Sequence, residues 1–386
     1  MDGLADRLSE GVAALERENL RRRRRVLDSP QGRQVRVDGR ELLNFSSNDY
    51  LGLASDPRLV AAAHRALDEY GVGSGASPLV SGHLRSHEEA EARFAAFAGL
   101  PRALLFASGY SANLEILTVL GGTEAEVFGD RLNHACLHDG ARLSRSVYTR
   151  YAHLDLDELE RGLAASRAAT RIVASDAVFS MDGDLAPLPR MLELCERYDA
   201  WLVLDDAHGI GVLGERGRGS LEHFAIASPR IVYMATLGKA LGGYGAFVSG
   251  AAQTVEWMLQ RARTYIFSTA LPPVMAAAAS AAIGLVESDP ALLSRLRARI
   301  AEFRSACAAL GVPVTPSDTA IQPVIVGEAA RAIELSTRLL ARGLLVPAIR
   351  PPTVPRGTSR LRVSLSAAHQ RSDVERLAGA LAECLA

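Results

Sequence analysis

Short apolar runs alternate with amphipathic stretches along the chain from residue 42 to about residue 280. The apolar runs predict strands at Ala103–Phe106, Arg171–Ser175, Trp201–Leu204, Ile231–Ala235 and Ala246–Ser249. Between them, apolar residues recur at helical spacing, as Met191, Leu194 and Tyr198 do. Because alternating strands and helices favour a mostly parallel sheet flanked by helices, we expect an α/β fold whose large domain spans residues 46–280.

The pattern changes over the last hundred residues. A long helical stretch reaches about residue 310, and a Pro-rich turn lies at Pro351–Gly357. The pattern further predicts a strand at Ile321–Val326, a helix at Glu328–Arg342, strands at Leu344–Ile349 and Arg360–Leu365, and a final helix from about Ser372. These elements make a small sheet of their own, so we expect a smaller α+β domain over residues 281–386.

Residues 1–45 are expected to form an N-terminal helix and arm. A polar helix is predicted over residues 4–27, and it ends in five consecutive arginines, Arg21–Arg25. Such a run is typical of arms that bind nucleic acid. The chain, however, carries 43 lysines and arginines against 44 aspartates and glutamates, a formal net charge of −1. This balance argues against nucleic acid and anionic membranes as partners, and favours a solvated helix face.

The composition is that of a folded protein, since 48% of the residues are hydrophobic and 23% are charged. Four scattered cysteines without a C-x-x-C pair indicate reduced thiols in a reducing compartment. The most apolar segment, Val274–Val286, is mostly alanine and shorter than the roughly 20 residues of a membrane span, so it predicts a packed helix. The N-terminus does not read as a signal peptide. We therefore expect a soluble, cytoplasmic protein.

Two motifs point to nucleotide binding but lack the context that such sites need. Gly71–Ala76 satisfies the G-x-G-x-x-A pattern of dinucleotide sites, which must follow a strand, whereas residues 57–70 are predicted to be helical. Asp205–His208 resembles the acidic box of an NTPase, yet the chain has no G-x-x-x-x-G-K-[ST] loop. We therefore expect neither a dinucleotide site nor an NTPase.

Two pairs of histidines, His83 with His87 and His134 with His138, have the spacing that places both imidazoles on one helix face. A metalloprotease pair has glutamate directly after the first histidine, and neither pair has it. No third ligand is evident for either pair. We therefore expect no metal site, and one packed and one exposed histidine in each pair.

Four features predict a set of reactive groups at one edge of the sheet. One strand runs directly into Asp205, and His208 follows three residues later. The next strand leads to Lys239 on a glycine-rich turn, and another leads into Ser108–Asn113 at a helix N-terminus, where anions bind. Ligands of α/β proteins bind at the carboxyl ends of strands. A lysine, an acid and an anion seat are what pyridoxal phosphate (PLP) requires for its Schiff base, its pyridinium nitrogen and its phosphate.

With these motifs in place, the sequence resembles the α-oxoamine synthases, PLP enzymes of fold type I that join an amino acid to an acyl thioester and release CO₂. The resemblance runs from about Leu20 to the C-terminus. It rests on motifs in the family's order, namely Asn44–Leu53, Val178–Asp184, Asp205–Gly209, Thr236–Lys239, Ala320–Pro323 and Ile349–Pro355. The last two motifs are most similar to the branch of the family that serves biotin synthesis.

The resemblance implies a role for each matching residue. Lys239 would form the Schiff base and then transfer the substrate proton, and Asp205 would pair with the pyridinium nitrogen. His134 would stack on the ring and meet the substrate. The other implied contacts are with the phenolic oxygen (His208, with Ser180 nearby), the cofactor and its phosphate (Gly109, Tyr110, Thr236), the amino-acid carboxylate (Asn48, Arg350) and the acyl substrate (Thr353 and an N-terminal arginine). The register favours Arg21, but any member of Arg21–Arg25 stays open.

The resemblance also implies a reaction and an assembly. L-alanine would condense with a pimeloyl thioester, carried by CoA or by acyl-carrier protein, and lose CO₂. Members of the family are homodimers with the site at the subunit boundary, and Phe267–Thr269 resembles a segment that reaches the neighbour's cofactor. Two alternatives stay open at this point: a sister synthase that uses glycine and another acyl-CoA, and a non-catalytic partner subunit.

Overall fold

The computed structural model describes residues 3–386, which form two compact units that we treat separately. The larger unit contains Asn48–Ser180 and Asp184–Arg295. The smaller unit contains the N-terminal segment up to Ser47, the short stretch Met181–Gly183, and Leu296–Ala386. The domain limits expected from the sequence, 46–280 and 281–386, stay a prediction.

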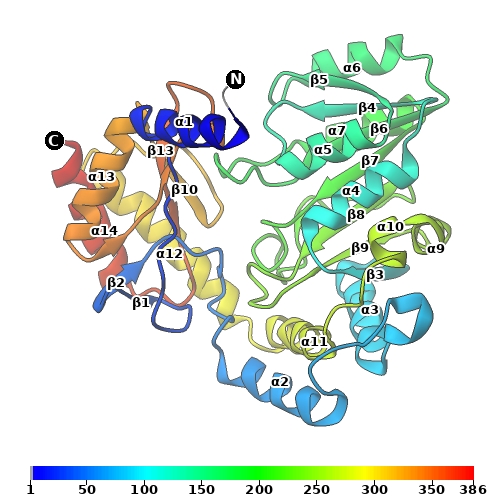
Figure 1. The fold of residues 1–386 in the computed structure, drawn as a ribbon, viewed down its shortest axis with the longest axis horizontal. Coiled ribbons are helices and arrows are strands. Elements are labelled where there is room, and N and C mark those ends of the chain that lie inside the picture. The colour runs from blue at the N-terminus through cyan, green and yellow to red at the C-terminus, as the bar shows by residue number, and fades with distance from the viewer. Residues whose placement is uncertain (1–2) are drawn as a thin grey trace. The chain divides into compact units, whose positions relative to one another are not determined.

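The larger unit is built on a seven-stranded sheet (Figure 1). Its strands are β3 (Arg102–Phe106), β4 (Ala125–Asp130), β5 (Val147–Tyr151), β6 (Thr170–Asp176), β7 (Ala200–Asp205), β8 (Ile231–Thr236) and β9 (Ala246–Gly250). They lie in the order β3-β9-β8-β7-β6-β4-β5. β9 runs antiparallel to both of its neighbours, and the other pairs are parallel. The mostly parallel sheet expected from the apolar runs is therefore confirmed.

Helices pack on this sheet, as α3, α4 and α7 do, or on other helices, as α2 does on α11. The helices of the larger unit are α2 (Pro57–Tyr70), α3 (Arg85–Ala98), α4 (Gly109–Leu120), α5 (Ala135–Leu143), α6 (Leu156–Ala165), α7 (Leu188–Arg197), α8 (Ser220–His223), α9 (Ala252–Arg261), α10 (Arg263–Ile266) and α11 (Pro273–Ser288), with a π-helical turn at Pro78–Gly82. Helix α2 begins with Pro57 at its first position and with the Asp56 carboxylate accepting from the Arg58 amide, so its start is fixed locally. Helix α11 is largely buried, as expected of Val274–Val286.

The smaller unit has two three-stranded sheets, ordered β1-β2-β11 and β10-β13-β12. Its elements are α1 (Leu4–Arg17), β1 (Gln34–Val37), β2 (Arg40–Asn44), the part of α12 (Ala291–Ala309) from Leu296 on, β10 (Ile321–Gly327), α13 (Ala329–Ala341), β11 (Leu344–Leu345), β12 (Ala348–Ile349), β13 (Ser359–Ser364) and α14 (Arg371–Leu385). Helix α13 packs on β12 and β13 and against α14. This is the α+β arrangement expected from the pattern.

Two sequence expectations about local structure are wrong. The first helix ends at Arg17, ten residues before the predicted end, because Asn19 adopts a positive φ of 58° that an α-helix cannot continue. The five arginines after it are therefore not helical. The predicted strand Leu344–Ile349 is broken into two short strands around Pro347, which has no amide to donate.

None of the helices in the described part of the chain is, by itself, long and apolar enough to cross a membrane. Helices α11 and α12 pass that test only together, as a bent pair, by length and composition.

His153 bridges two loops of the larger unit. Its Nδ1 lies 3.0 Å from an Asp130 carboxylate oxygen, and its Nε2 lies 2.8 Å from an Asp184 oxygen. Burial alone would lower the pKa of the imidazole, but its hydrogen bonds to the two carboxylates outweigh burial and raise the pKa to about 10. His153 is therefore a cation that ties the chain after β5 to β4 and to Asp184.

We expect the stability that His153 provides to disappear at high pH. Because the folded-state pKa lies above the unfolded value of about 6.5, the contribution is complete below pH 6.5 and is lost as the pH rises through about 10. His153→Gln should lower the free energy of unfolding by roughly 2 kcal/mol at pH 6.5. Urea unfolding of both proteins at pH 6.5 and pH 10 measures this difference, which should nearly vanish at pH 10. A difference that stays constant would contradict the assignment.

Candidate active site

Three neighbouring parallel strands of the larger unit end in polar residues. They are Asp176 at the end of β6, Asp205 at the end of β7 and Thr236 at the end of β8. Asp176 and Asp205 are direct cross-strand partners in the register of the sheet. Because the carboxyl ends of parallel strands meet at one edge, the sheet itself gathers these groups.

Asp205 is buried and is held by neutral donors. The Asn113 side-chain amide donates to Oδ2 at 2.7 Å, and the Ala207 backbone amide donates to Oδ1 at 2.9 Å. Asp205 makes no ion pair with any residue from 3 to 386. Its neighbour Asp176 is fully enclosed, and burial, followed by the charge of Asp205, holds the pKa of Asp176 well above its usual value.

Lys239 lies on a tight turn between β8 and β9. The Gly242 amide donates to the Lys239 carbonyl at 2.9 Å, and the Gly243 amide donates to the Leu237 carbonyl at 2.8 Å. Gly242 has a φ of 65°, and a Cβ there would lie 2.5 Å from the Ala54 nitrogen. Only glycine therefore allows the turn that carries Lys239 to pack against the loop that follows Tyr50.

The Lys239 amine begins a chain of polar contacts. Its Nζ lies 2.8 Å from His208 Nε2, and His208 Nδ1 lies 2.7 Å from the Tyr50 hydroxyl. The Tyr50 hydroxyl in turn donates to Asn48 Oδ1 at 3.1 Å. The structure thus brings together three residues that the sequence singled out, Asn48, His208 and Lys239, through Tyr50, to which the sequence analysis gave no role.

His134 caps the N-terminus of α5 at the same edge. Its backbone amide donates to Asp176 at 2.6 Å, and its Nδ1 lies 2.8 Å from Cys136 Sγ. Burial lowers the pKa of the imidazole, against the opposing charge of Asp205. Burial therefore favours the neutral form of the ring. Cys136 also accepts from Asn113 at 3.1 Å, so the thiol joins His134 to the residue that holds Asp205.

The N-terminus of α4 lies against the end of β8. A Cβ at Gly109 would lie 3.4 Å from the Met234 sulfur and 3.8 Å from Thr236 Cβ. Ser108 caps the helix by accepting from the Ser111 amide at 3.1 Å. The Tyr110 side chain is exposed, and its hydroxyl donates to Asp139. Gly109, Tyr110 and Thr236, predicted to hold a phosphate, are thus gathered around one helix N-terminus.

Three residues predicted to bind substrate, Arg21, Arg350 and Thr353, lie in the smaller unit. A cavity of about 660 Å³ is lined by Arg21, Arg22, Arg23, Arg25, Arg350 and Thr353, among others. Arg22 donates to the Thr353 hydroxyl at 3.3 Å, whereas Arg21 pairs with Glu16 at 3.0 Å. Burial and the charge of Arg22 lower the pKa of Arg350, so two cations face each other in the smaller unit. An anion in this cavity would relieve their repulsion.

The sequence-predicted residues therefore fall into two sets. Asn48, Ser180 and the residues around Lys239 belong to the larger unit, and Arg21, Arg350 and Thr353 belong to the smaller one. Ser180 lies on the loop that leaves β6, four residues after Asp176. Three residues of the site, Tyr50, Asn113 and Asp176, have no role predicted from the sequence, although Tyr50 and Asn113 lie inside the motifs Asn44–Leu53 and Ser108–Asn113.

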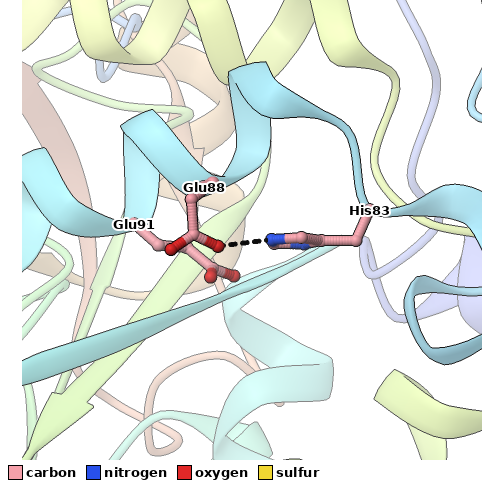
Figure 2. A group of neighbouring side chains, drawn as sticks. All are labelled: His83, Glu88 and Glu91. Carbon is pink, nitrogen blue, oxygen red and sulfur yellow. Dashed lines mark hydrogen bonds and ion pairs between the residues drawn. The ribbon is translucent and has the colours of Figure 1, made fainter.

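Neither histidine pair gathers a metal-ligand set. His87 Nε2 lies 2.6 Å from the Leu271 carbonyl, and His138 Nδ1 contacts the Tyr148 hydroxyl. The one group of three potential ligands among residues 3–386 is His83, Glu88 and Glu91, whose ligand atoms lie within 4.8 Å of one another (Figure 2).

The contacts of this group account for its arrangement. His83 pairs with Glu88 at 2.9 Å, as Figure 2 shows, and Glu91 accepts from the Leu105 amide at 2.8 Å. Burial raises the pKa of Glu91 to about 7. Each side chain thus has a protein partner, and we assign no metal to the group.

Comparison with known proteins shows the family to which this chain belongs. The sequence family described as "Aminotransferase class I and II" matches residues 40–381. The chain is 56% identical over 374 residues to an 8-amino-7-oxononanoate synthase of Methylobacillus flagellatus, which covers 97% of this chain and 94% of that protein. The chain belongs to this family. Within it, the match identifies the 8-amino-7-oxononanoate synthases as its relatives.

Solved structures agree with this assignment. A serine palmitoyltransferase of S. paucimobilis, solved with a bound PLP adduct of myriocin, superposes with a TM-score of 0.92 at 27% identity, over 98% of this chain and 96% of that one. An 8-amino-7-oxononanoate synthase of Francisella tularensis superposes with a TM-score of 0.77 at 29% identity, over 89% of this chain and 97% of that one. The expected fold, that of PLP enzymes of fold type I, is confirmed.

Proposed function

We propose that this protein is a PLP-dependent acyltransferase that condenses L-alanine with a pimeloyl thioester, giving 8-amino-7-oxononanoate, CO₂ and the free thiol in biotin synthesis. The observation that carries the proposal is the placement of the buried carboxylate Asp205 at the end of β7 and of Lys239 on the turn that follows the neighbouring strand β8. The identity of 56% to an 8-amino-7-oxononanoate synthase supports the choice of substrates.

The groups at the sheet edge fit PLP. Asp205 is a buried carboxylate that only neutral donors hold, and such a charge suits a cationic partner such as a protonated ring nitrogen. The Oδ1 atom of Asn113, next to it, is buried without a partner of its own. When bound, PLP supplies an electron sink for a carbanion at the α-carbon of the amino acid.

Lys239 has two tasks in this proposal. Its amine anchors the cofactor covalently and, once the amino acid has displaced it, moves the α-proton. Lys239 is the single lysine of the chain, so no other lysine side chain can take over either task. His208, at 2.8 Å from Nζ, orients the amine. Together with Ser180 it would also hold the phenolic oxygen of the cofactor.

The phosphate would be held by the start of α4 together with Thr236. The first amides of a helix lack partners inside the helix and attract anions, which suits Gly109 and Tyr110. The Thr236 hydroxyl donates to the Gly245 carbonyl at 3.0 Å, so it must turn to reach a phosphate. Burial favours the neutral form of His134, which would lie on a cationic ring without repelling it.

Substrate anions would be bound by amide and guanidinium groups. Asn48 and Arg350 would hold the carboxylate of alanine, and Arg350 suits a bidentate contact. Thr353 and Arg21 would meet the pimeloyl chain, since both line the cavity of about 660 Å³. The ion pair of Arg21 with Glu16 is about half exposed on both sides, so a substrate carboxylate can replace it at little cost.

The proposal is tested by product analysis. Purified protein supplied with PLP is incubated with pimeloyl-CoA and either L-alanine or glycine, and products are followed by mass spectrometry together with release of the amino-acid carboxyl carbon as CO₂. Product from alanine supports the proposal. Product from glycine alone would assign the protein to a sister synthase, and no product from either would favour a non-catalytic partner subunit. Replacing pimeloyl-CoA by pimeloyl-acyl-carrier protein identifies the natural carrier.

Arg21→Ala is expected to raise the KM for the pimeloyl thioester about tenfold, because a charge-assisted hydrogen bond to the substrate is lost, with little change in the KM for alanine. Arg24→Ala is the matched control, since Arg24 belongs to the same run but does not line the cavity. Arg22→Ala tests which arginine of the run binds the substrate. A larger rise in KM in Arg22→Ala than in Arg21→Ala would assign this role to Arg22, the arginine that contacts Thr353.

We also propose that the protein acts as a homodimer in the cytoplasm. Phe267 is 71% exposed in the single chain, which suits the proposed contact of Phe267–Thr269 with a neighbour's site. Helix α1 exposes an apolar row, Leu4, Leu8, Val12 and Leu15. The four cysteines are buried and free, as is usual in reducing compartments. The molar mass in solution, by light scattering, tests the dimer.

A further inference from the structure

Tyr50 contacts two residues of the proposed site, Asn48 and His208. Tyr50 itself has no role in the chemistry described so far. We propose that Tyr50 is a positioning residue that holds His208 in the tautomer with its hydrogen on Nδ1, so that Nε2 offers a lone pair to the Lys239 amine. The contacts themselves do not depend on the substrate, but their catalytic meaning rests on the proposed function.

The direction of the hydrogen bonds follows from the number of hydrogens available. A tyrosine hydroxyl has a single hydrogen, and in the structure that hydrogen is donated to Asn48 Oδ1 at 3.1 Å. The contact of 2.7 Å between the same hydroxyl and His208 Nδ1 must then be donated by the imidazole. A neutral imidazole carries one hydrogen, so Nε2 is left as the acceptor.

The acceptor on Nε2 faces Lys239 Nζ at 2.8 Å, a distance at which an amine hydrogen is shared directly. When a proton passes from the lysine ammonium to His208, the Nζ–H bond breaks and an Nε2–H bond forms. The resulting imidazolium has a partner on each side, the Tyr50 oxygen on Nδ1 and the lysine amine on Nε2. His208 can therefore hold the proton next to Lys239, which is left as the free amine that a base requires.

The surroundings keep this chain of groups rigid. Tyr50 is fully buried, so water does not compete for its hydroxyl. Asp49 accepts from the Leu53 and Ala54 amides at 2.8 and 3.1 Å, which fixes the loop that carries Tyr50. Gly242 brings the lysine-bearing turn against the backbone of the same loop. A fixed loop and a fixed turn make the tautomer a built-in property of the fold.

The tautomer is measured directly by NMR of the full-length protein without cofactor, with its nine histidines labelled with ¹⁵N. The signals of His208 are identified as those that are missing from the spectrum of His208→Asn. In the wild type we expect the ¹⁵N chemical shift of Nδ1 in the range of a protonated ring nitrogen and that of Nε2 in the range of an unprotonated one. In Tyr50→Phe the hydroxyl contact on Nδ1 is lost while the Lys239 contact on Nε2 remains, so we expect both signals to move toward each other as the two tautomers become mixed. A wild-type signal of the opposite tautomer, or no change in Tyr50→Phe, would overturn the proposal.

Two further variants separate positioning from general damage. Asn48→Ala keeps the hydroxyl but frees its hydrogen for Nδ1, so it should shift the tautomer in the same direction as Tyr50→Phe. Tyr148→Phe removes another hydroxyl that contacts a histidine Nδ1, that of His138, and should leave the His208 signals unchanged. If Tyr50→Phe does not fold, Asn48→Ala decides the question alone: unchanged His208 signals there contradict the proposal.

The kinetic consequence is measured separately. With alanine and pimeloyl-CoA, Tyr50→Phe should lower kcat about tenfold and leave the KM for alanine within about twofold, since the phenol meets His208 and not the substrate. A rise in KM with unchanged kcat would make Tyr50 a substrate-binding residue instead. If the wild type does not turn over alanine, the proposed function fails, while the NMR result on the tautomer still stands or falls by itself.

Discussion

Replacing Lys239 by alanine is expected to abolish turnover, with a loss of about 10⁴-fold or more, because one amine both anchors the cofactor and moves the α-proton. The structure offers no substitute nearby, since Lys239 is the single lysine of the chain and His208 is already its hydrogen-bond partner. Product formation from alanine and pimeloyl-CoA measures the loss. Near-normal activity in the variant would contradict the proposed mechanism.

Because the chain has a single lysine, covalent labelling by the cofactor reports on Lys239 alone among the side chains. Wild-type protein treated with PLP and then borohydride should carry the label on the peptide that contains Lys239, and the alanine variant should carry none on any side chain. Lys239→Arg keeps a positive charge beside His208 but forms no Schiff base, so it should be as inactive as Lys239→Ala. Added methylamine should restore part of the turnover in Lys239→Ala if the missing group is the amine itself.

The strands that carry the site were predicted from the sequence to within one residue. β6, β7 and β8 are buried on both faces, so their residues form continuous apolar runs that stand out from the flanking helices. β4 and β5 were missed because their patterns are weaker. β4 includes Glu126 and Asp130, and β5 lies at the edge of the sheet with four of its five residues at least partly exposed.

The groups that organise the site were harder to predict. Asn113 and Asp205 are 92 residues apart in the sequence, and Tyr50 and His208 are 158 apart. Local sequence patterns place a residue on a strand or a turn, and the strand order then decides which strand ends meet. These patterns give no information on which side-chain atoms touch. The contacts of Asn113 with Asp205 and of Tyr50 with His208 are therefore seen only in the folded chain.

The arginine run shows the same limit within one short segment. Five identical residues give no pattern from which to choose one, and the predicted helix assigned them regular positions that they do not have. Because α1 ends before them, at Arg17, neighbouring arginines point to different partners, Arg21 to Glu16 and Arg22 to Thr353. Only the backbone path after Asn19 decides that Arg21, Arg22, Arg23 and Arg25 line the cavity while Arg24 does not.

Replacing Asp205 by asparagine is expected to lower kcat by about 10²–10³-fold, the second-largest effect that we expect. The amide is nearly the same size as the carboxylate but carries no charge, so it cannot keep a proton on the ring nitrogen. Asp176 does not compensate, because burial keeps its own pKa well above the usual value and its oxygen accepts from the His134 amide. Turnover with alanine measures the loss, and cofactor affinity, by equilibrium titration, should fall in parallel.

Asp206→Asn is the matched control for this substitution. Asp206 is the next residue and is equally buried, but its carboxylate accepts from the Tyr233 hydroxyl at 2.6 Å and from the Ser220 amide at 2.8 Å, away from Asn113. Burial raises the pKa of Asp206 to about 7, so its charge at neutral pH is already partial. The control should therefore keep its kcat within about threefold while unfolding at a lower urea concentration. Equal losses of kcat in the two variants would mean that the charge of Asp205 has no special role, and the proposed cofactor chemistry would then fail.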